Sequence, residues 1–306
     1  MITYTLDWPK ESAIPGHESE FSWHDLGTNR VLDFHGDPVH AGLSILSDGN
    51  HHMALLDSVQ HYLKNNPDLK DIFYVTLPPQ VLNGILEQRE IHIANLKINI
   101  QPDVYIGPEN ILQNWHQKRA VDTPALFARS RGLAWLIRKD NPTGFSSISD
   151  LLSGKFRFFI SNPVSEKASY QVYHDTLCKL AQQQALNSNE LSTSLSKGCP
   201  WVMHGRFVHH REAPEAIASK QADVAMVYYH LALRYTRIFP DIFEMMPLPG
   251  SGTEQVSADQ EITEYAIARV RDGNQHAADF CDYMKGETVA DIYQRHGLQG
   301  TRTTNK

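Results

Sequence analysis

Short apolar runs alternate with amphipathic helical segments along most of this chain, and that alternation restricts the fold more than any other feature. The run 43–47 (LSILS) is typical of a buried strand, and apolar residues recur at helical spacing over 51–64. Asn65-Asn66-Pro67 ends that helix, because the residue before a proline is driven out of the helical conformation. The β-branched and aromatic run 71–76 follows as a second strand. A strand, a helix and a strand in direct succession predict a βαβ unit with a parallel sheet.

The alternation continues toward the end of the chain and defines the fold class as α/β, with mostly parallel sheets flanked by helices. Ser147 and Asp150 stand at the spacing of a capping box and predict a short helix. Residues 187–198, rich in Asn, Ser and Thr, are expected to form a loop, and residues 1–30 a polar arm. Further strands are expected at 103–107, 133–139, 155–161, 223–229, 242–246 and 264–270.

The charge balance argues against nucleic acid as a partner. The 306 residues include 28 Lys and Arg against 35 Asp and Glu, a net charge of -7, whereas nucleic-acid binders usually carry a basic excess or stripe.

No apolar run is long enough to span a membrane. The first residues lack a signal peptide, which predicts a cytoplasmic protein as written, or a periplasmic one if a leader was removed. The three cysteines are scattered and predict neither a disulfide framework nor a zinc site.

Four motifs occur in the order typical of one protein family. They are the strand Asp103–Tyr105, the turn Arg138–Phe145, the loop from Asn162-Pro163 to Ala168-Ser169-Tyr170, and the segment 211–229 (REAPEAIASKQADVAMVYY). With these motifs the chain resembles the type II periplasmic solute-binding proteins over most of its length. It is most similar to their molybdate/tungstate-binding branch, which supplies substrate to ABC transporters.

The resemblance implies two α/β lobes with a ligand cleft between them. The lobes would comprise 31–128 with 240–306, and 129–239, and the chain would cross near Leu126–Arg131 and near Pro240. Such proteins close on a ligand by hinge motion, and closure requires a ligand that binds the closed form better, through contacts with both lobes. The implied function is capture of a small anionic solute, an oxyanion such as molybdate or tungstate included, for an ABC permease or for sensing. It involves no catalytic residue, no cofactor and no metal.

In lobe 1, the candidate ligand contacts follow the first two strands. Asn50 and His51 stand on the turn after the first strand, where a helix N-terminus offers N–H groups to an anion, and Thr76 ends the second strand. The alternative is that Asn50 only caps the helix. Two features depart from the family pattern. Asp48 would repel an anion and leaves room for a zwitterion, and two prolines after Thr76 remove backbone donors.

In lobe 2, the candidates lie near helix starts and at the end of a buried strand. Arg211 offers a bidentate contact to an oxyanion or a carboxylate. Ser165 and Ser169 could instead serve as ordinary helix caps, and Tyr229 could pack in the core. For Arg211 the alternative is a solvated pair with Glu212 or Glu215. The candidate residues of this lobe are Asn162, Ser165, Ser169, His210, Arg211 and Tyr229.

A metal-dependent hydrolase on the same fold is the alternative function. The chain has 16 histidines, and the pairs His51-His52 and His209-His210 are the candidate metal ligands. Adjacent residues of a helix face different directions, however, and no HExxH motif supplies a catalytic base. Nucleophile-elbow, P-loop and dinucleotide-binding motifs are absent from the sequence as well. Cys199 has no activating partner marked in the sequence and is expected to be incidental.

Overall fold

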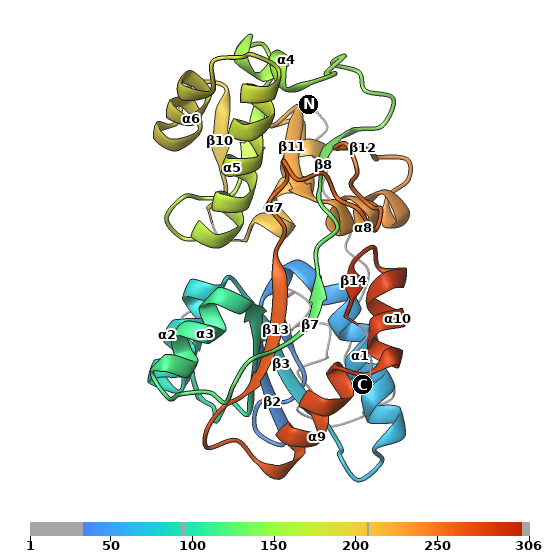
Figure 1. Ribbon diagram of the computed structural model, residues 1–306. Coiled ribbons are helices and arrows are strands. Elements are labelled where there is room, and N and C mark those ends of the chain that lie inside the picture. Colours follow the sequence, from blue (N-terminus) through green and yellow to red (C-terminus); the bar gives the residue numbers. More distant parts are fainter. Residues whose placement is uncertain (1–32, 94–95, 207, 302–306) are drawn as a thin grey trace. The chain divides into compact units, whose positions relative to one another are not determined.

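The computed structural model describes residues 33–93, 96–206 and 208–301, which divide into two compact units (Figure 1). We call residues 130–263 the middle unit, and the described residues up to 129 together with those from 264 onward the terminal unit. The arm expected at 1–30 lies outside the described residues. Within the described part of the chain, no helix is both long enough and apolar enough to cross a membrane.

The sequence predicts the second crossing between units near Pro240, but the structure places it after Thr263. The reason is strand β12 (Phe243–Pro247), which pairs antiparallel with β8 (Leu133–Arg138) in the sheet of the middle unit. The stretch 240–263 therefore belongs to the middle unit and not, as expected, to the other. The sequence of an edge strand does not indicate which strand it pairs with. The local pattern therefore could not assign the stretch 240–263 to the middle unit.

The terminal unit is built on a seven-stranded sheet in the order β1-β3-β2-β6-β13-β7-β14. As the βαβ pattern predicts, β2 runs parallel to β3, and it runs parallel to β6 as well. Successive residues of β3 enter opposite core clusters, Ile72 and Tyr74 on one face and Phe73 and Val75 on the other. Both faces of this strand are therefore covered by packed side chains. The strands are β1 (Phe34–His35), β2 (Leu43–Ser47), β3 (Ile72–Thr76), β6 (Val104–Pro108), β7 (Ala125–Arg129), β13 (Glu264–Arg269) and β14 (Gln299–Gly300).

Helices flank this sheet (Figure 1). Two further strands, β4 and β5, form a small antiparallel sheet of their own. The turn after β2 is a short 3-10 helix, η2 (Gly49–His51), so the first α-helix begins one residue later than the sequence pattern indicates. The remaining elements are α1 (His52–Asn65), α2 (Pro79–Gln88), β4 (Glu90–Ile93), β5 (Leu96–Asn99), α3 (Glu109–Gln117), α9 (Gln275–Met284) and α10 (Glu287–Arg295).

The middle unit has a five-stranded sheet in the order β10-β9-β11-β8-β12. β9 runs parallel to both β10 and β11, whereas β8 pairs antiparallel with β11 and β12. The capping box predicted at Ser147 and Asp150 is confirmed at the start of α4. The remaining elements are α4 (Ile148–Leu152), β9 (Phe158–Ile160), α5 (Lys167–Gln183), α6 (Ser188–Lys197), β10 (Val202–His204), α7 (His209–Ala218), β11 (Val224–Tyr228) and α8 (Tyr229–Ile238).

Helix α6 stands where the sequence predicts a loop at 187–198. The Asn187 side chain caps this helix by accepting a hydrogen bond from its backbone. Leu191 and Leu195, one helical turn apart, are fully buried, and α6 packs against α5. The prediction was wrong because two leucines on one face outweigh the weak helix preference of Asn, Ser and Thr.

Replacing Gly36 with alanine is expected to destabilise the protein by about 1–3 kcal/mol. Gly36 has a positive φ of 82°, and a Cβ there would lie 2.4 Å from the Ile72 carbonyl oxygen and 2.9 Å from the Phe73 Cα. Both contacts are with backbone atoms, which cannot relieve the clash by a change of rotamer as a side chain can. Urea unfolding measures the loss. Gly84→Ala is the control, because a Cβ at Gly84 meets nothing within 4 Å. An unchanged midpoint for Gly36→Ala would contradict this expectation.

Candidate functional site

The candidate site residues gather at one edge of the sheet in each unit. Parallel strands end at a common edge, and ligands of open α/β sheets bind beyond that edge. In the terminal unit, β2, β3 and β6 end there; we call the residues 47–51, 76–78 and 108–109 the terminal edge. In the middle unit, β9, β10 and β11 end together; we call the described residues of 161–169 and 205–211, with 228–229, the middle edge.

At the terminal edge, Asp48 rather than Asn50 caps the first helical turn. The Asp48 carboxylate accepts hydrogen bonds from the Asn50 N–H at 2.8 Å and from its side-chain amide at 3.3 Å. The alternative that Asn50 is the N-cap is therefore wrong, because the Asp48 side chain holds that position and the Asn50 N–H is the group that it caps. Asp48 is 2% exposed, and loss of hydration raises the pKa of its carboxyl to about 6 although both contacts with Asn50 lower it.

Two other predicted contacts of the terminal edge are hydrogen-bonded within the unit. His51 is fully buried, with Nδ1 2.8 Å from the Tyr293 hydroxyl and Nε2 3.4 Å from the Ser47 hydroxyl. Thr76 is fully buried as well, and its hydroxyl donates to the Asp33 carboxylate at 3.1 Å. Because these polar atoms already have partners, we place neither side chain among the ligand contacts proposed below.

At the middle edge, Asn162 shapes the loop that follows β9. Its side-chain oxygen accepts hydrogen bonds from the N–H groups of Val164 and Ser165, at 2.9 and 3.1 Å. Its amide donates to the Gly205 carbonyl at 2.9 Å, just beyond the end of β10. The side chain thus ties two strand ends together, which is a structural role in forming the edge.

The loop leads into α5, whose first turn presents hydrogen-bond donors. The Ser165 hydroxyl is buried and has no hydrogen-bond partner among the residues that the structure describes. The first N–H groups of a helix have no partner within it, and the side chain of the N-cap residue, Glu166, does not cap them. Ser169 differs, because its hydroxyl donates to the Glu166 carbonyl at 3.2 Å and lies 2.9 Å from the Ser161 hydroxyl. Ser165 therefore retains an unused donor, whereas Ser169 is engaged.

Helix α7 begins with three buried side chains, His209, His210 and Arg211. Arg211 is only 9% exposed, so the solvated pair with Glu212 or Glu215 that we weighed for it is wrong in placing the Arg211 side chain in solvent. His209 is neutral, because burial lowers its pKa to about 4, and its Nε2 lies 2.9 Å from the Met226 carbonyl oxygen. The Tyr235 hydroxyl donates to the backbone carbonyl of His210. The first turn of α7 is thus fixed from several sides.

Glu166 is the residue of this edge that sequence reasoning missed. It is buried, and its carboxylate accepts a hydrogen bond from the His209 N–H at 2.9 Å. This bond joins the start of α5 to the start of α7, 43 positions apart. The only sequence signal is an acidic residue directly before a helix, which is too common to single out.

The two tyrosines at the end of β11 have different surroundings. Tyr228 is buried, and its hydroxyl lies 2.8 Å from that of Thr263. Tyr229 opens α8 and is partly exposed, with its ring against Gly252, where a Cβ would lie 2.4 Å from the ring. Tyr229 is therefore the partly exposed tyrosine of the middle edge, and Tyr228 the buried one.

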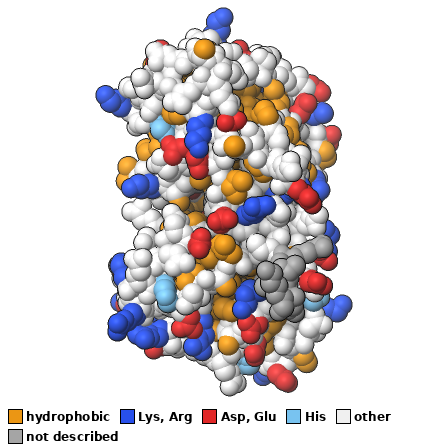
Figure 2. Space-filling model, in the orientation of Figure 1, with side chains coloured by type: hydrophobic (Ala, Val, Ile, Leu, Met, Phe, Trp, Pro, Cys, Tyr) orange, Lys and Arg blue, Asp and Glu red, His pale blue; other side chains and the backbone are white. Residues whose placement is uncertain are grey.

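The histidine pairs do not assemble a metal site within the described part of the chain, which contains no group of three His, Cys, Asp or Glu side chains able to hold a metal ion. His51 and His52 belong to the terminal unit, where the ring of His52 lies 2.8 Å from the Gly49 carbonyl oxygen. His209 and His210 belong to the middle unit. On the face drawn in Figure 2, basic and acidic side chains of the described residues are interspersed.

Comparison with protein families finds one model that matches, described as bacterial extracellular solute-binding protein, over residues 88–299. This range covers more than half of the chain and includes the whole middle edge. None of the curated proteins compared with the chain matches it in sequence.

Several solved structures share this fold at low sequence identity. A periplasmic molybdate-binding protein from Azotobacter vinelandii is 13% identical, with a TM-score of 0.59 over 83% of this chain and 97% of that one. The sulfate-binding protein SubI from Mycobacterium tuberculosis is 13% identical, with a TM-score of 0.63 over 86% and 88%. Iron-bound HitA from Pseudomonas aeruginosa is 12% identical, with a TM-score of 0.55 over 86% and 88%. The chain therefore has the type II periplasmic-binding-protein fold.

Proposed function

Because the chain belongs to the bacterial extracellular solute-binding protein family, we propose that it binds a small anionic solute reversibly and delivers it to an ABC permease or reports it to a sensor. Such a function needs binding residues and no turnover. Two structures of this fold, the molybdate- and sulfate-binding proteins, are named for oxyanions, which supports an anion of that kind. The alternative, a metal-dependent hydrolase, has no assembled ligand set among the described residues.

The observation that carries the proposal is the unpartnered hydroxyl of Ser165 at the start of α5. A buried hydroxyl without a partner is uncommon, because burial without a hydrogen bond costs free energy. An anion beside this hydroxyl would accept its hydrogen bond, together with those of the first N–H groups of α5. The positive end of the helix dipole favours the same negative charge.

We further propose that Arg211, His210 and Tyr229 add contacts from the middle edge and that Asn50 adds one from the terminal edge. Arg211 supplies the positive charge. In this proposal Asn162 and Ser169 shape the loop rather than touch the ligand, and closure on the ligand follows if it binds the closed form better. Asp48, buried at the terminal edge, favours an anion that also carries a hydrogen-bond donor, such as an ammonium or hydroxyl group.

The test is a thermal unfolding screen of the metal-stripped protein with single ligands. The panel holds molybdate, tungstate, sulfate, phosphate, small carboxylates, amino acids and divalent metals. A ligand at 100 times its Kd adds about 2.7 kcal/mol of stability, which raises the Tm of a protein of this size by several degrees. We expect a shift with one class of anion. A shift with zinc alone would contradict the proposal and favour the hydrolase.

Replacing Ser165 with alanine is expected to weaken binding of that anion about 5- to 10-fold, the value of one hydrogen bond. The same change is expected to leave the ligand-free protein as stable as the wild type or slightly more stable, because the hydroxyl has no partner to lose. Isothermal titration and urea unfolding measure the two effects. Ser194→Ala, within helix α6, is the control and should change neither binding nor stability appreciably. A loss of stability with unchanged affinity would assign Ser165 a structural role.

A further inference from the structure

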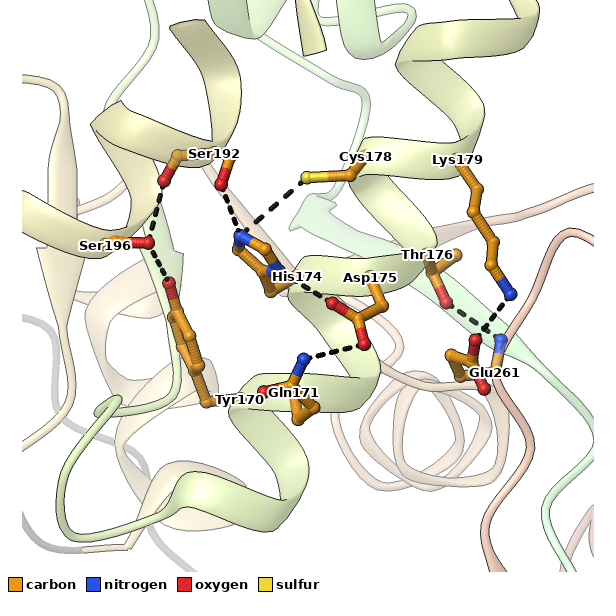
Figure 3. A network of polar contacts seen from close by, with 10 residues as sticks. All are labelled: Tyr170, Gln171, His174, Asp175, Thr176, Cys178, Lys179, Ser192, Ser196 and Glu261. Atoms are coloured by element: carbon orange, nitrogen blue, oxygen red, sulfur yellow. Dashed lines mark hydrogen bonds and ion pairs between the residues drawn. The ribbon is translucent and has the colours of Figure 1, made fainter. Parts of the chain in front are cut away.

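Helix α5 places a thiol, an imidazole and a carboxylate together, away from the middle edge (Figure 3). His174 and Cys178 are four residues apart and so share one face of the helix, and the Cys178 sulfur lies 3.7 Å from His174 Nε2. His174 Nδ1 lies 2.8 Å from the Asp175 carboxylate. A nucleophile within reach of a base, and a base oriented by a third group, is the arrangement that activates nucleophiles in proteins.

The carboxylate determines how the imidazole is oriented. Asp175 accepts a hydrogen bond from Nδ1, so Nδ1 carries a proton and Nε2 is directed at the sulfur. Ser192 from α6 lies 2.9 Å from the same Nε2 and fixes the ring from the other side. In Figure 3 both the thiol and this hydroxyl point toward Nε2. The His174 side chain is 17% exposed and that of Asp175 35%, and Cys178 is partly exposed, so small molecules have access to the group.

The charges near His174 favour its protonated form. The Cys178 sulfur, and after it the Asp175 carboxylate, raise the pKa of His174 to about 9, although burial lowers it. Also on α5, the Tyr170 ring lies 5.5 Å from the His174 ring. The Tyr170 hydroxyl is hydrogen-bonded to the Ser196 hydroxyl. The group that α6 presents to the imidazole is the neutral Ser192 hydroxyl. A cationic imidazole beside a sulfur stabilises the thiolate, which is the reactive form of cysteine.

We propose that Cys178, His174 and Asp175 form a nucleophilic thiol centre that undergoes exchange with low-molecular-weight disulfides. His174 holds the proton and balances the thiolate charge, and Asp175 is a positioning residue. The thiolate attacks one sulfur of the small disulfide, a protein–ligand S–S bond forms, and the original S–S bond breaks. Its electron pair leaves with the second sulfur as a thiolate, which can take the proton from His174. The small disulfide is the oxidant, so electrons balance.

The other two cysteines serve as internal references, because all three thiols are free. Burial raises the pKa of Cys281 to about 12, which disfavours its thiolate. Cys199 is partly exposed, like Cys178. A difference in rate between Cys178 and Cys199 therefore reports the neighbouring imidazole rather than exposure alone.

The test exposes the fully reduced protein to oxidised glutathione between pH 6 and 9 and reads the modified cysteine by peptide mass spectrometry. At pH 6.5 we expect Cys178 to react at least about tenfold faster than Cys199 or Cys281. Equal rates for Cys178 and Cys199 would overturn the proposal.

Three variants show whether Cys178 reacts fast because His174 activates its thiol or only because the thiol is accessible. His174→Gln is expected to slow Cys178 about tenfold at pH 6.5 and to leave the Cys199 rate unchanged. Asp175→Asn should slow Cys178 less and shift its rate–pH profile, which a purely structural role would not do. Ser192→Ala should leave the Cys178 rate unchanged or raise it, because Nε2 loses a competing partner. If His174→Gln does not fold, the rate–pH profile of Cys178 in Asp175→Asn decides the question. A profile identical to that of the wild type would overturn the proposal.

Discussion

Replacing Arg211 with alanine is expected to weaken binding of the anionic ligand about 10- to 150-fold. This range corresponds to the loss of one charged hydrogen-bonding group, about 1.5–3 kcal/mol. Arg211 stands in the first turn of α7 and is 9% exposed, so its charge is little screened by water. Titration of the purified variant with the anion found in the unfolding screen measures the effect.

Two further variants make the Arg211 result specific. Arg211→Lys keeps the charge but loses the planar pair of donors, so its affinity should fall between those of wild type and Arg211→Ala. Arg206 is exposed on the same loop, and Arg206→Ala should change the affinity by less than about twofold. Wild-type affinity in Arg211→Ala would show that the anion binds elsewhere and would remove Arg211 from the proposed site.

Replacing Asp48 with asparagine is expected to stabilise the protein at pH 7 by an amount on the order of 3 kcal/mol. Burial raises the pKa of Asp48 from an ordinary 3.8 to about 6, so the folded state favours the neutral carboxyl. The contribution of Asp48 to stability is therefore fully present below pH 3.8 and is lost as the pH rises through about 6. Asparagine stays neutral throughout and keeps an oxygen that accepts the Asn50 N–H.

Urea unfolding of both proteins between pH 4 and pH 7.5 tests this expectation. The difference in unfolding free energy should be small at pH 4 and reach its full value above about pH 6.5. Asp68→Asn removes an exposed carboxylate of the same unit and should show no comparable gain. A difference that is constant over the whole range would mean that hydrogen bonding, rather than ionisation, distinguishes Asp48→Asn from the wild type.

The same variant distinguishes the classes of ligand that the proposed function allows. At pH 7.5, Asp48→Asn should strengthen binding of a fully deprotonated oxyanion such as molybdate, because a negative charge is removed from the terminal edge. It should weaken binding of a zwitterion, because an acceptor for the ammonium group loses its charge. Unchanged affinity for both classes would place Asp48 outside the ligand contacts.

Much of the fold was predictable because its signals are local. The run 71–76 alternates between two core clusters as β3, and Ser147 with Asp150 caps α4 as expected. The failures concern features that depend on distant partners. The crossing after Thr263 depends on the pairing of β12 with β8, and α6 depends on packing against α5. Neither partner is visible in a window of ten or fifteen residues.

The sequence by itself determined the α/β class and the residues that end the parallel strands, because strand and helix periodicities are properties of neighbouring residues. The tertiary structure decided which polar groups at those strand ends are already satisfied. The Thr76 hydroxyl is bonded to Asp33, 43 positions away, and His51 is bonded to Tyr293. The Ser165 hydroxyl has no such partner in the described part of the chain. Hydrogen-bond partners far apart in the chain meet only in the folded protein, so a list of polar residues cannot tell used donors from available ones.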